Sequence, residues 1–324
     1  MSAALTVAPQ PASVPVLRAP LSLFGRAVLL ATDGSPPSNA AARIASALAE
    51  RTGAVIHVVN VIDTRSAPMP PGIHLALGIA EAAIGPSVHS EQVDAVRAEI
   101  ASAVGKPVDW RIRVALGSPS RVIVQKARRL RAALVIIGLR RHGRLERAMQ
   151  DETTLEVMRR AACPVLGVAT DATSLPIKVL AAVDFSRSSM AAARAARAVL
   201  GDGGTIVLAY APLVRFVLAD DGEAVIHKLG VAAGFARCRA ELEGDRVTTD
   251  QVLLHAELST PVASKLIEYA DGARCDLIAA GSARKGRLDR WMLGSVSTDL
   301  VRDGRHSVLI VPPRRLKASE TRTR

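Results

Sequence analysis

The chain has 324 residues, 49% of them hydrophobic and only 2% aromatic, which suffices for two domains with aliphatic cores. The longest apolar runs are far shorter than the roughly 20 residues of a membrane helix, so we expect no membrane span. Three widely spaced cysteines form neither a disulfide framework nor a zinc pattern, and they predict a reducing, cytoplasmic compartment without a metal centre.

The first predicted strand and helix follow a Pro- and Ala-rich start. Residues 1–24 lack the continuous apolar block of a signal peptide and are interpreted as a disordered leader. The stretch "AVLLATDGSPPSNAAARIASALAERTGAVIHVVNVID" then gives an apolar strand ending at Asp33, a Ser-containing turn, an Ala-rich helix and a second strand. Ser suits the helix start, and Gly53 suits a left-handed residue that ends the helix.

The remainder of the first half continues this alternation. Residues 111–143, "RIRVALGSPSRVIVQKARRLRAALVIIGLRRHG", predict a strand, a helix with Pro119 in its first turn, and a strand ending at Gly138. A last helix and strand follow in residues 154–170, "TLEVMRRAACPVLGVAT".

The same order of elements recurs from residue 178. "KVLAAVDFSRSSMAAARAARAVLGDGGTIVLAYAPL" repeats the strand, here ending at Asp184, and the Ala-rich helix, which we expect Gly201 to end. "QVLLHAELSTPVASKLIEYADGARCDLIAAGSARKG" repeats the next strand, a helix with Pro261 in its first turn, and a strand that ends in Gly. The second half ends, like the first, in a predicted helix and strand, in the stretch "STDLVRDGRHSVLIVPP".

Each half therefore predicts the order β-α-β-α-β-α-β-α-β. Such alternation indicates the α/β class, with two tandem doubly wound parallel-sheet domains of Rossmann-like type. We place them at residues 25–170 and 177–313, joined by a linker at 171–176 and followed by a basic tail at 314–324. The second helix of each half is the least defined, because residues 68–88 suggest a long loop or a partly helical insert.

The last strand of each half would form a sheet edge. These strands are Val165–Ala169 and Ser307–Val311, and an exposed apolar edge invites pairing. We expect the two halves to pair through them as a pseudo-twofold, with further self-association of the chain through other surfaces.

Several ordered motifs resemble the universal stress protein family, in a tandem two-domain form. They are "VLLATDGS" and "VLAAVDFS" at the first strands, the "GSP" and "STP" turns, "MLGSVSTDL", and "ACPVLGV" and "HSVLIVP" near the domain ends. The resemblance covers about residues 25–313 and implies the adenine nucleotide alpha hydrolase-like variant of the Rossmann fold.

Members of this family that bind ATP share a pattern of Gly, two residues, Gly, nine residues, Gly, then Ser or Thr. In the second half, Gly281 fills the first position and Gly294-Ser295 the last two, whereas Arg284 stands in place of the middle glycine. Backbone N–H groups at such glycines and at a helix start can meet phosphate. The resemblance implies ATP as a ligand of the second domain, held by Asp184, Ala211, Gly281, Ser282, Arg284, Gly294, Ser295 and Val296.

The first half departs further from that pattern. Asp33, Val61 and Gly138 match the acid, the apolar position beside adenine and the first glycine, but Asp151-Glu152 replace the final Gly-Ser. Two carboxylates near phosphate cost about 1–4 kcal/mol at a separation of about 4 Å. This first-domain site is therefore interpreted as degenerate, with Arg140 and nearby arginines able to pair with acids of the loop.

Positive charge is concentrated in the first half. Residues 25–170 hold 19 basic and 12 acidic residues, against 17 and 16 in residues 177–313, and the net charge of the chain is +12. Nucleic acid is nonetheless not the expected partner, because the chain has too few aromatic residues for a stacking platform. Attachment through the basic first half and tail stays open as an alternative that steep salt dependence would mark.

The motifs favour a bacterial stress-response binding module over an enzyme of metabolism. No Walker A, GxGxxG, HExxH or GxSxG motif is present, and no catalytic or metal-binding residue is assigned. A scaffold with closed pockets and a weak ATPase remain as alternatives, and the sequence leaves open which adenine nucleotide, if any, is bound.

Overall fold

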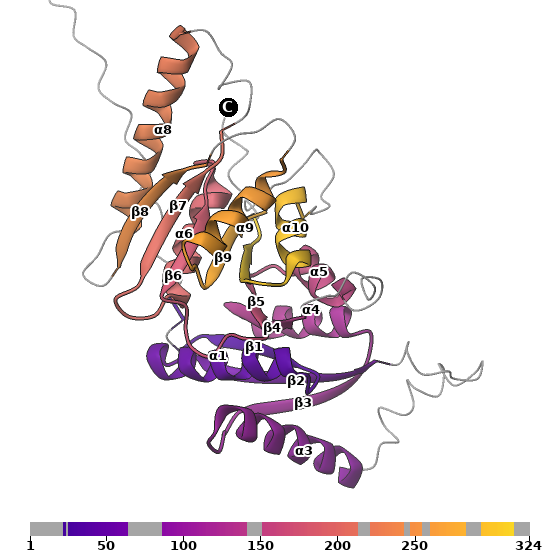
Figure 1. The fold of residues 1–324 in the computed structure, drawn as a ribbon. Coiled ribbons are helices and arrows are strands. Elements are labelled where there is room, and N and C mark those ends of the chain that lie inside the picture. The colour runs from indigo at the N-terminus through magenta and orange to yellow at the C-terminus, as the bar shows by residue number, and fades with distance from the viewer. Residues whose placement is uncertain are drawn as a thin grey trace, which may run out of the picture.

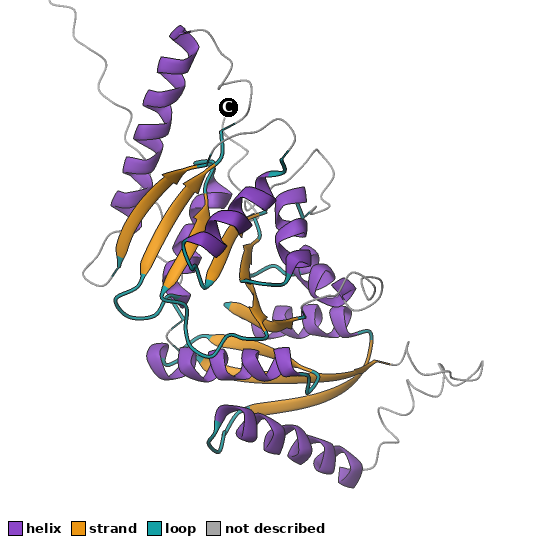
Figure 2. Ribbon diagram, in the orientation of Figure 1, coloured by secondary structure: helices purple, strands orange, loops and turns teal. Residues whose placement is uncertain are grey.

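The computed structural model confirms the α/β class, with a mostly parallel sheet covered by helices on both faces (Figures 1 and 2). It describes residues 22–23, 25–63, 86–140, 151–212, 221–242, 247–254, 260–282 and 293–313. The predicted leader, the basic tail and most of the predicted insert lie outside the described residues. None of the helices in the described part of the chain is long and apolar enough to cross a membrane.

Strands and helices alternate in both halves, as predicted. The first half contains β1 (Ala27–Thr32), α1 (Pro36–Thr52), β2 (Val55–Asp63), α3 (Pro86–Val104), β3 (Arg111–Gly117), α4 (Pro119–Leu130), β4 (Leu134–Leu139), α5 (Asp151–Arg160) and β5 (Val165–Ala169). The second contains β6 (Lys178–Ala182), α6 (Arg187–Val199), β7 (Thr205–Tyr210), α8 (Asp221–Leu242), β8 (Thr248–Leu253), α9 (Val262–Gly272), β9 (Leu277–Gly281), α10 (Ser295–Asp303) and β10 (Ser307–Val311).

The ten strands form one sheet in the order β3-β2-β1-β4-β5-β10-β9-β6-β7-β8. Neighbours within each half are parallel, whereas β5 and β10 pair antiparallel, with Leu166 opposite Leu309. The two last strands therefore join the halves within one chain, as the sequence predicted. In each half the strand order reverses at the first strand, between β1 and β4 and between β6 and β9, which is where open α/β sheets bind ligands.

Aliphatic side chains fill both faces of the sheet. Leu29 and Leu30 are fully buried on opposite faces, because successive strand residues alternate. One layer packs under α1, α3, α6 and α8, and the other under α4, α5, α9 and α10. Each layer contains residues of both halves, so the core is continuous across the seam.

Two of the predicted helix ends were wrong in detail. Gly53 does end α1 in the left-handed region, with φ +65°, and Pro119 does begin α4. However, α6 ends at the extended, buried Leu200, because the N–H of Gly201 already bonds Pro176 O at 2.6 Å. Pro261 precedes α9 as its N-cap residue instead of lying in its first turn.

An arginine of the first half caps a helix of the second. The guanidinium of Arg51, at the end of α1, donates to Leu200 O and, at 2.7 Å, to Ala198 O at the end of α6. Carbonyls at a helix C-terminus lack intrahelical donors and carry partial negative charge. This contact therefore ties the two halves together beside the β5–β10 seam.

We expect Arg51→Met to lower the free energy of unfolding by about 1–3 kcal/mol, since charged hydrogen bonds to two carbonyls are lost. Arg187→Met, at the exposed first residue of α6, is the matched control and should change stability little. Urea denaturation of both variants measures the difference. Equal stability of the two variants would contradict the capping role.

Candidate functional site

The structure brings the predicted site residues of each half to the carboxyl end of its strands. Asp33 follows β1 beside Gly138 in β4, and Asp184 follows β6 beside Gly281 at the end of β9. Ala211 and Ser282 directly follow β7 and β9, and Val61 lies near the end of β2. Arg284 lies outside the described residues.

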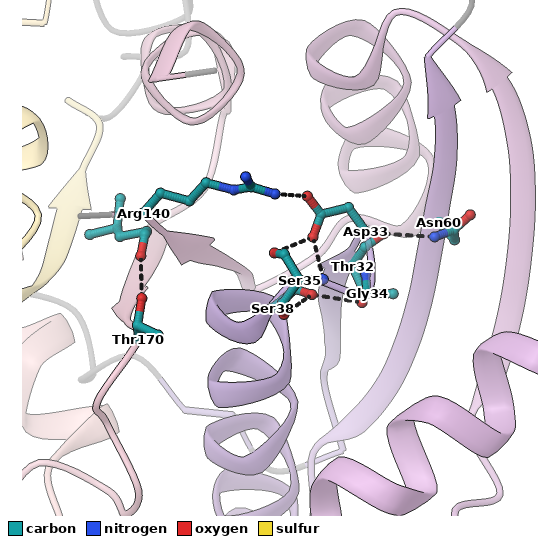
Figure 3. A network of polar contacts seen from close by, with 9 residues as sticks. Thr32, Asp33, Gly34, Ser35, Ser38, Asn60, Arg140 and Thr170 are labelled. Carbon is teal, nitrogen blue, oxygen red and sulfur yellow. Dashed lines mark hydrogen bonds and ion pairs between the residues drawn. The ribbon is translucent and has the colours of Figure 1, made fainter. Parts of the chain in front are cut away.

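In the first half, the carboxylate of Asp33 is already engaged by its own chain (Figure 3). Its Oδ1 accepts hydrogen bonds from the backbone N–H of Ser35 at 3.1 Å and from the hydroxyl of Ser35 at 2.5 Å. Its Oδ2 lies 3.3 Å from the guanidinium of Arg140, which directly follows β4. Burial by itself would raise the pKa of Asp33, but these bonds and the Arg140 charge hold it below the ordinary value.

In the second half, Asp184 has the same turn but a different partner set. Its Oδ1 accepts from the backbone N–H of Ser186 at 3.0 Å, and its own N–H donates to the Ser189 hydroxyl at 3.3 Å. When the two halves are aligned at Gly138 and Gly281, Arg140 corresponds to Ala283, which carries no charge. In the sequence, an alanine thus stands in the second half where the first half has the arginine that pairs with the acid.

The two turns also differ in the residue after the aspartate. Gly34 has φ +76°, and a Cβ there would lie 2.4 Å from Oε1 of Glu99 in α3. Phe185 occupies the equivalent position with φ +60°, although bulky residues rarely adopt this region. A Cβ on Gly234 in α8 would lie 2.6 Å from the Phe185 ring, so a small helix residue there makes room for the ring.

Aromatic contacts offset the strain at Phe185. Its ring stacks on Tyr210 at a centroid distance of 5.1 Å and meets Phe235 edge-on at 5.3 Å. Each such pair contributes about 0.5–1.5 kcal/mol beyond simple burial. The cluster lies next to Ala211 and Asp184, and sequence reasoning missed it. The exchange of "DGS" for "DFS" between the two halves is the one signal that pointed to it.

The glycines of the phosphate pattern have different structural roles. A Cβ on Gly281 would lie 2.5 Å from the carbonyl of Ser188, and one on Gly138 would lie 2.6 Å from the backbone of Pro37. Both strand glycines are thus required for the close approach of α6 or α1, whatever they contribute to a ligand. Gly294 is different, because a Cβ there would meet nothing within 4 Å.

The helix that follows the loop begins differently in each half. Gly294 is the N-cap residue of α10, has no side-chain cap, and no acid stands in the first turn of that helix. Its first backbone N–H groups are therefore available to an anion. In the first half, α5 begins at Asp151, the position at which the family pattern has its last glycine.

A separate cavity of about 450 Å³ lies at the seam between the halves. It is lined by the linker residues Asp171–Ser174 and by the paired side chains of Asp271, Arg305 and His306. None of the predicted nucleotide-binding residues lines it.

Metal and thiol chemistry finds no support in the described part of the chain. No group of three His, Cys, Asp or Glu side chains could hold a metal ion there. Burial raises the pKa of Cys163 and Cys238 to about 11, so both thiols are protonated at neutral pH.

The fold is a doubly wound sheet. At each of its two switch points lie an aspartate and the N-terminus of a helix. The family model of the universal stress proteins matches this chain twice, at residues 25–169 and 177–312. The chain therefore belongs to the universal stress protein family, as a tandem member.

Relatives agree with this assignment. A universal stress protein of Thermus aquaticus, encoded in the QAH/OAS sulfhydrylase 3' region, is 30% identical over 141 residues, which is 44% of this chain and 96% of the relative. The crystal structure of a universal stress protein from Archaeoglobus fulgidus covers 89% of this chain and 98% of its own, with a TM-score of 0.60 at 18% identity. A functionally unknown Pseudomonas aeruginosa protein covers 89% and 92%, with a TM-score of 0.55 at 16% identity.

We expect Gly281→Ala to destabilise the protein by about 1–3 kcal/mol, because the new methyl overpacks against Ser188. Gly294→Ser is the control, since the space there is open and Ser is a favourable N-cap residue. Thermal unfolding distinguishes the two. A Gly281→Ala variant as stable as the wild type would show that α6 does not need this glycine.

Asp184 predicts a pH dependence of stability. Burial alone would raise its pKa, yet hydrogen bonds from Ser186 and Ser189 hold the pKa below the ordinary value. A lowered pKa contributes stability that is present above the unfolded pKa of about 3.9 and lost as pH falls through the folded pKa. The stability difference between wild type and Asp184→Asn should therefore shrink between pH 6 and pH 3, roughly, in denaturant titrations. A difference that does not change with pH would refute this.

Proposed function

We propose that this protein is a non-enzymatic, cytoplasmic stress-response binding module with one adenine-nucleotide site, in its second domain. The first domain, residues 25–170, keeps the scaffold with a closed site, and the second, residues 177–313, keeps a site open to ATP. The observation that carries this proposal is the contrast between the two first-strand aspartates. Asp33 forms an ion pair with Arg140, whereas Asp184 has alanine at the equivalent of that arginine.

The residues of the second domain have distinct roles in this proposal. Asp184 accepts hydrogen bonds from the adenosine part, and Ala211 lies beside the base, next to the stacked rings of Phe185 and Tyr210. The loop after Gly281 and Ser282, with Arg284, covers the phosphates.

The start of α10 completes the site. The N–H groups at Gly294, Ser295 and Val296 meet the phosphates, where the helix N-terminus carries partial positive charge.

The first domain replaces the ligand with its own charges. Arg140 takes the acid that adenosine would use, and the sequence has Asp151-Glu152 where the family pattern has the final Gly-Ser. A like-charge contact of about 1–4 kcal/mol weakens binding by roughly tenfold to a thousandfold. We therefore expect one nucleotide per chain.

Isothermal titration with ATP tests the proposal. The wild type should bind close to one ATP per chain, and Gly294→Asp should bind at least tenfold more weakly, because a carboxylate then faces the phosphates. Gly294→Asn is the matched control and should retain binding, since it has the same shape without the charge. Asp and Asn are both favourable N-cap residues, so neither variant should lose stability.

Other results would overturn the proposal in distinct ways. No heat of binding and no shift of the melting temperature with ATP would indicate a scaffold with closed pockets. Two ATP per chain would contradict the closed first site. Release of phosphate from ATP, lost in Asp184→Ala, would indicate an ATPase.

A further inference from the structure

Five cationic or titratable side chains gather on one face of the first half, which we call the β3–α4 basic face. The face consists of His57 in β2, Arg111 and Arg113 in β3, and Lys126 and Arg129 in α4. His57 is paired in register with Arg111, at the amino ends of these parallel strands. Since α4 runs back across the sheet, its last turns lie over the same ends.

The packing places these residues on the same side of the sheet. Val59, two residues after His57, packs in one core layer with Ile123 and Ala127 of α4. His57 and Val59 project to the same face of the strand, and their register partners Arg111 and Arg113 do likewise. The head groups of Arg111, Arg113 and Arg129 are exposed.

The charges of the face lie close enough to repel one another. Burial, and then the charges of Arg113 and Arg129, lower the pKa of Lys126. Burial, and then Lys126 and Arg111, lower the pKa of His57. An anion that approaches this face therefore relieves repulsion as well as gaining attraction.

The second half shows that the fold does not need these cations. In β7 and β8 the equivalent pair is Val207 opposite Asp250, in place of His57 opposite Arg111. When α4 and α9 are aligned by their buried residues, Lys126 corresponds to Tyr269 and Arg129 to Gly272. Burial, then Cys275 and Asp250, raise the pKa of Tyr269, so the surroundings at the equivalent place are acidic.

We propose that the β3–α4 basic face binds the phosphodiester backbone of double-stranded nucleic acid without reading its base sequence. The four cations lie on two elements, β3 and α4, at one end of the ten-stranded sheet, which suits a long polyanion better than a single small anion. Most of them are arginines, whose forked guanidinium fits phosphate oxygens. The face thus holds four of the basic residues of the first half.

Other anionic partners fit the face less well. Single-stranded nucleic acid needs aromatic rings on which bases stack, and the neighbouring Trp110 packs against the core instead. A membrane surface is usually bound by cations combined with large apolar side chains that insert, which the five residues of the face lack. The face also lies at the amino ends of its strands, away from the proposed nucleotide site, so the two proposals stand independently.

Binding of the full-length protein to a fluorescent duplex DNA fragment, measured at several salt concentrations, tests the proposal. Each neutralised phosphate contributes a slope of about −0.9 to log K against log salt, so four cations give about −3.6. The triple variant Arg111→Gln, Lys126→Gln, Arg129→Gln should lower the magnitude of the slope by about 2.7 and weaken binding at low salt. Two duplexes of unrelated sequence should bind equally.

A charge-matched control comes from the second half. The control is the triple variant Lys228→Gln, Arg237→Gln, Arg302→Gln, which also removes three positive charges, here from exposed positions in α8 and α10. Its slope of log K against log salt should stay within about one unit of the wild-type slope. A further variant without residues 314–324 isolates any contribution of the basic tail. Circular dichroism and ATP titration of both triple variants should match the wild type, which shows that fold and nucleotide site are intact.

Three outcomes would overturn the proposal. The first is that the wild type does not bind duplex DNA at low salt. The second is that both triple variants lose binding equally, which would assign the binding to net charge alone. Alternatively, vesicles that contain phosphatidylserine bind through the face and DNA does not, which would identify a membrane surface as its partner.

Discussion

The antiparallel pairing of β5 with β10 is the contact on which the rest of the structure depends. Three register pairs join two five-stranded sheets into one, and both apolar edges that would otherwise pair with another chain are covered. Because the strands reverse direction at this seam, the carboxyl ends of the two halves point in opposite directions. Each switch point is therefore built by one half alone, and each half is free to change its site without disturbing the other.

The duplication also lets each half serve as a comparison for the other. Where both halves keep the same residue against the same neighbour, as at Gly138 and Gly281, packing explains it. Where the halves differ, as at Gly34 and Phe185, the contacting residue of the neighbouring helix differs as well. Glu99 lies close to Gly34, and Gly234 lies close to the ring of Phe185. Such paired exchanges show that the turn and the helix that covers it are one unit of packing.

Much of the fold could be predicted from sequence because its signals are local. Alternating apolar strands and Ala-rich helices gave the element order, and the repeat gave the pairing of the last strands. What sequence could not give depends on distant contacts. Arg140 contacts Asp33, 107 positions away in the chain, and no local pattern indicated this pair. Gly201 failed as a helix end for the same reason, because the linker carbonyl of Pro176 already holds its N–H.

In the first half, the charged residues at the carboxyl ends of the strands are arranged differently from those at the amino ends. At the carboxyl ends, Asp33 has Arg140 as a partner within the chain. At the amino ends of β2 and β3, burial and then the charges of Arg113 and Arg129 lower the pKa of Lys126, so the charged form of this lysine costs stability that hydrophobic burial must offset. The equivalent strands of the second half fold without this cost, with Asp250 in the place of Arg111. This repulsion, which the second copy of the duplicated fold does without, is the observation from which we propose a surface for a polyanion.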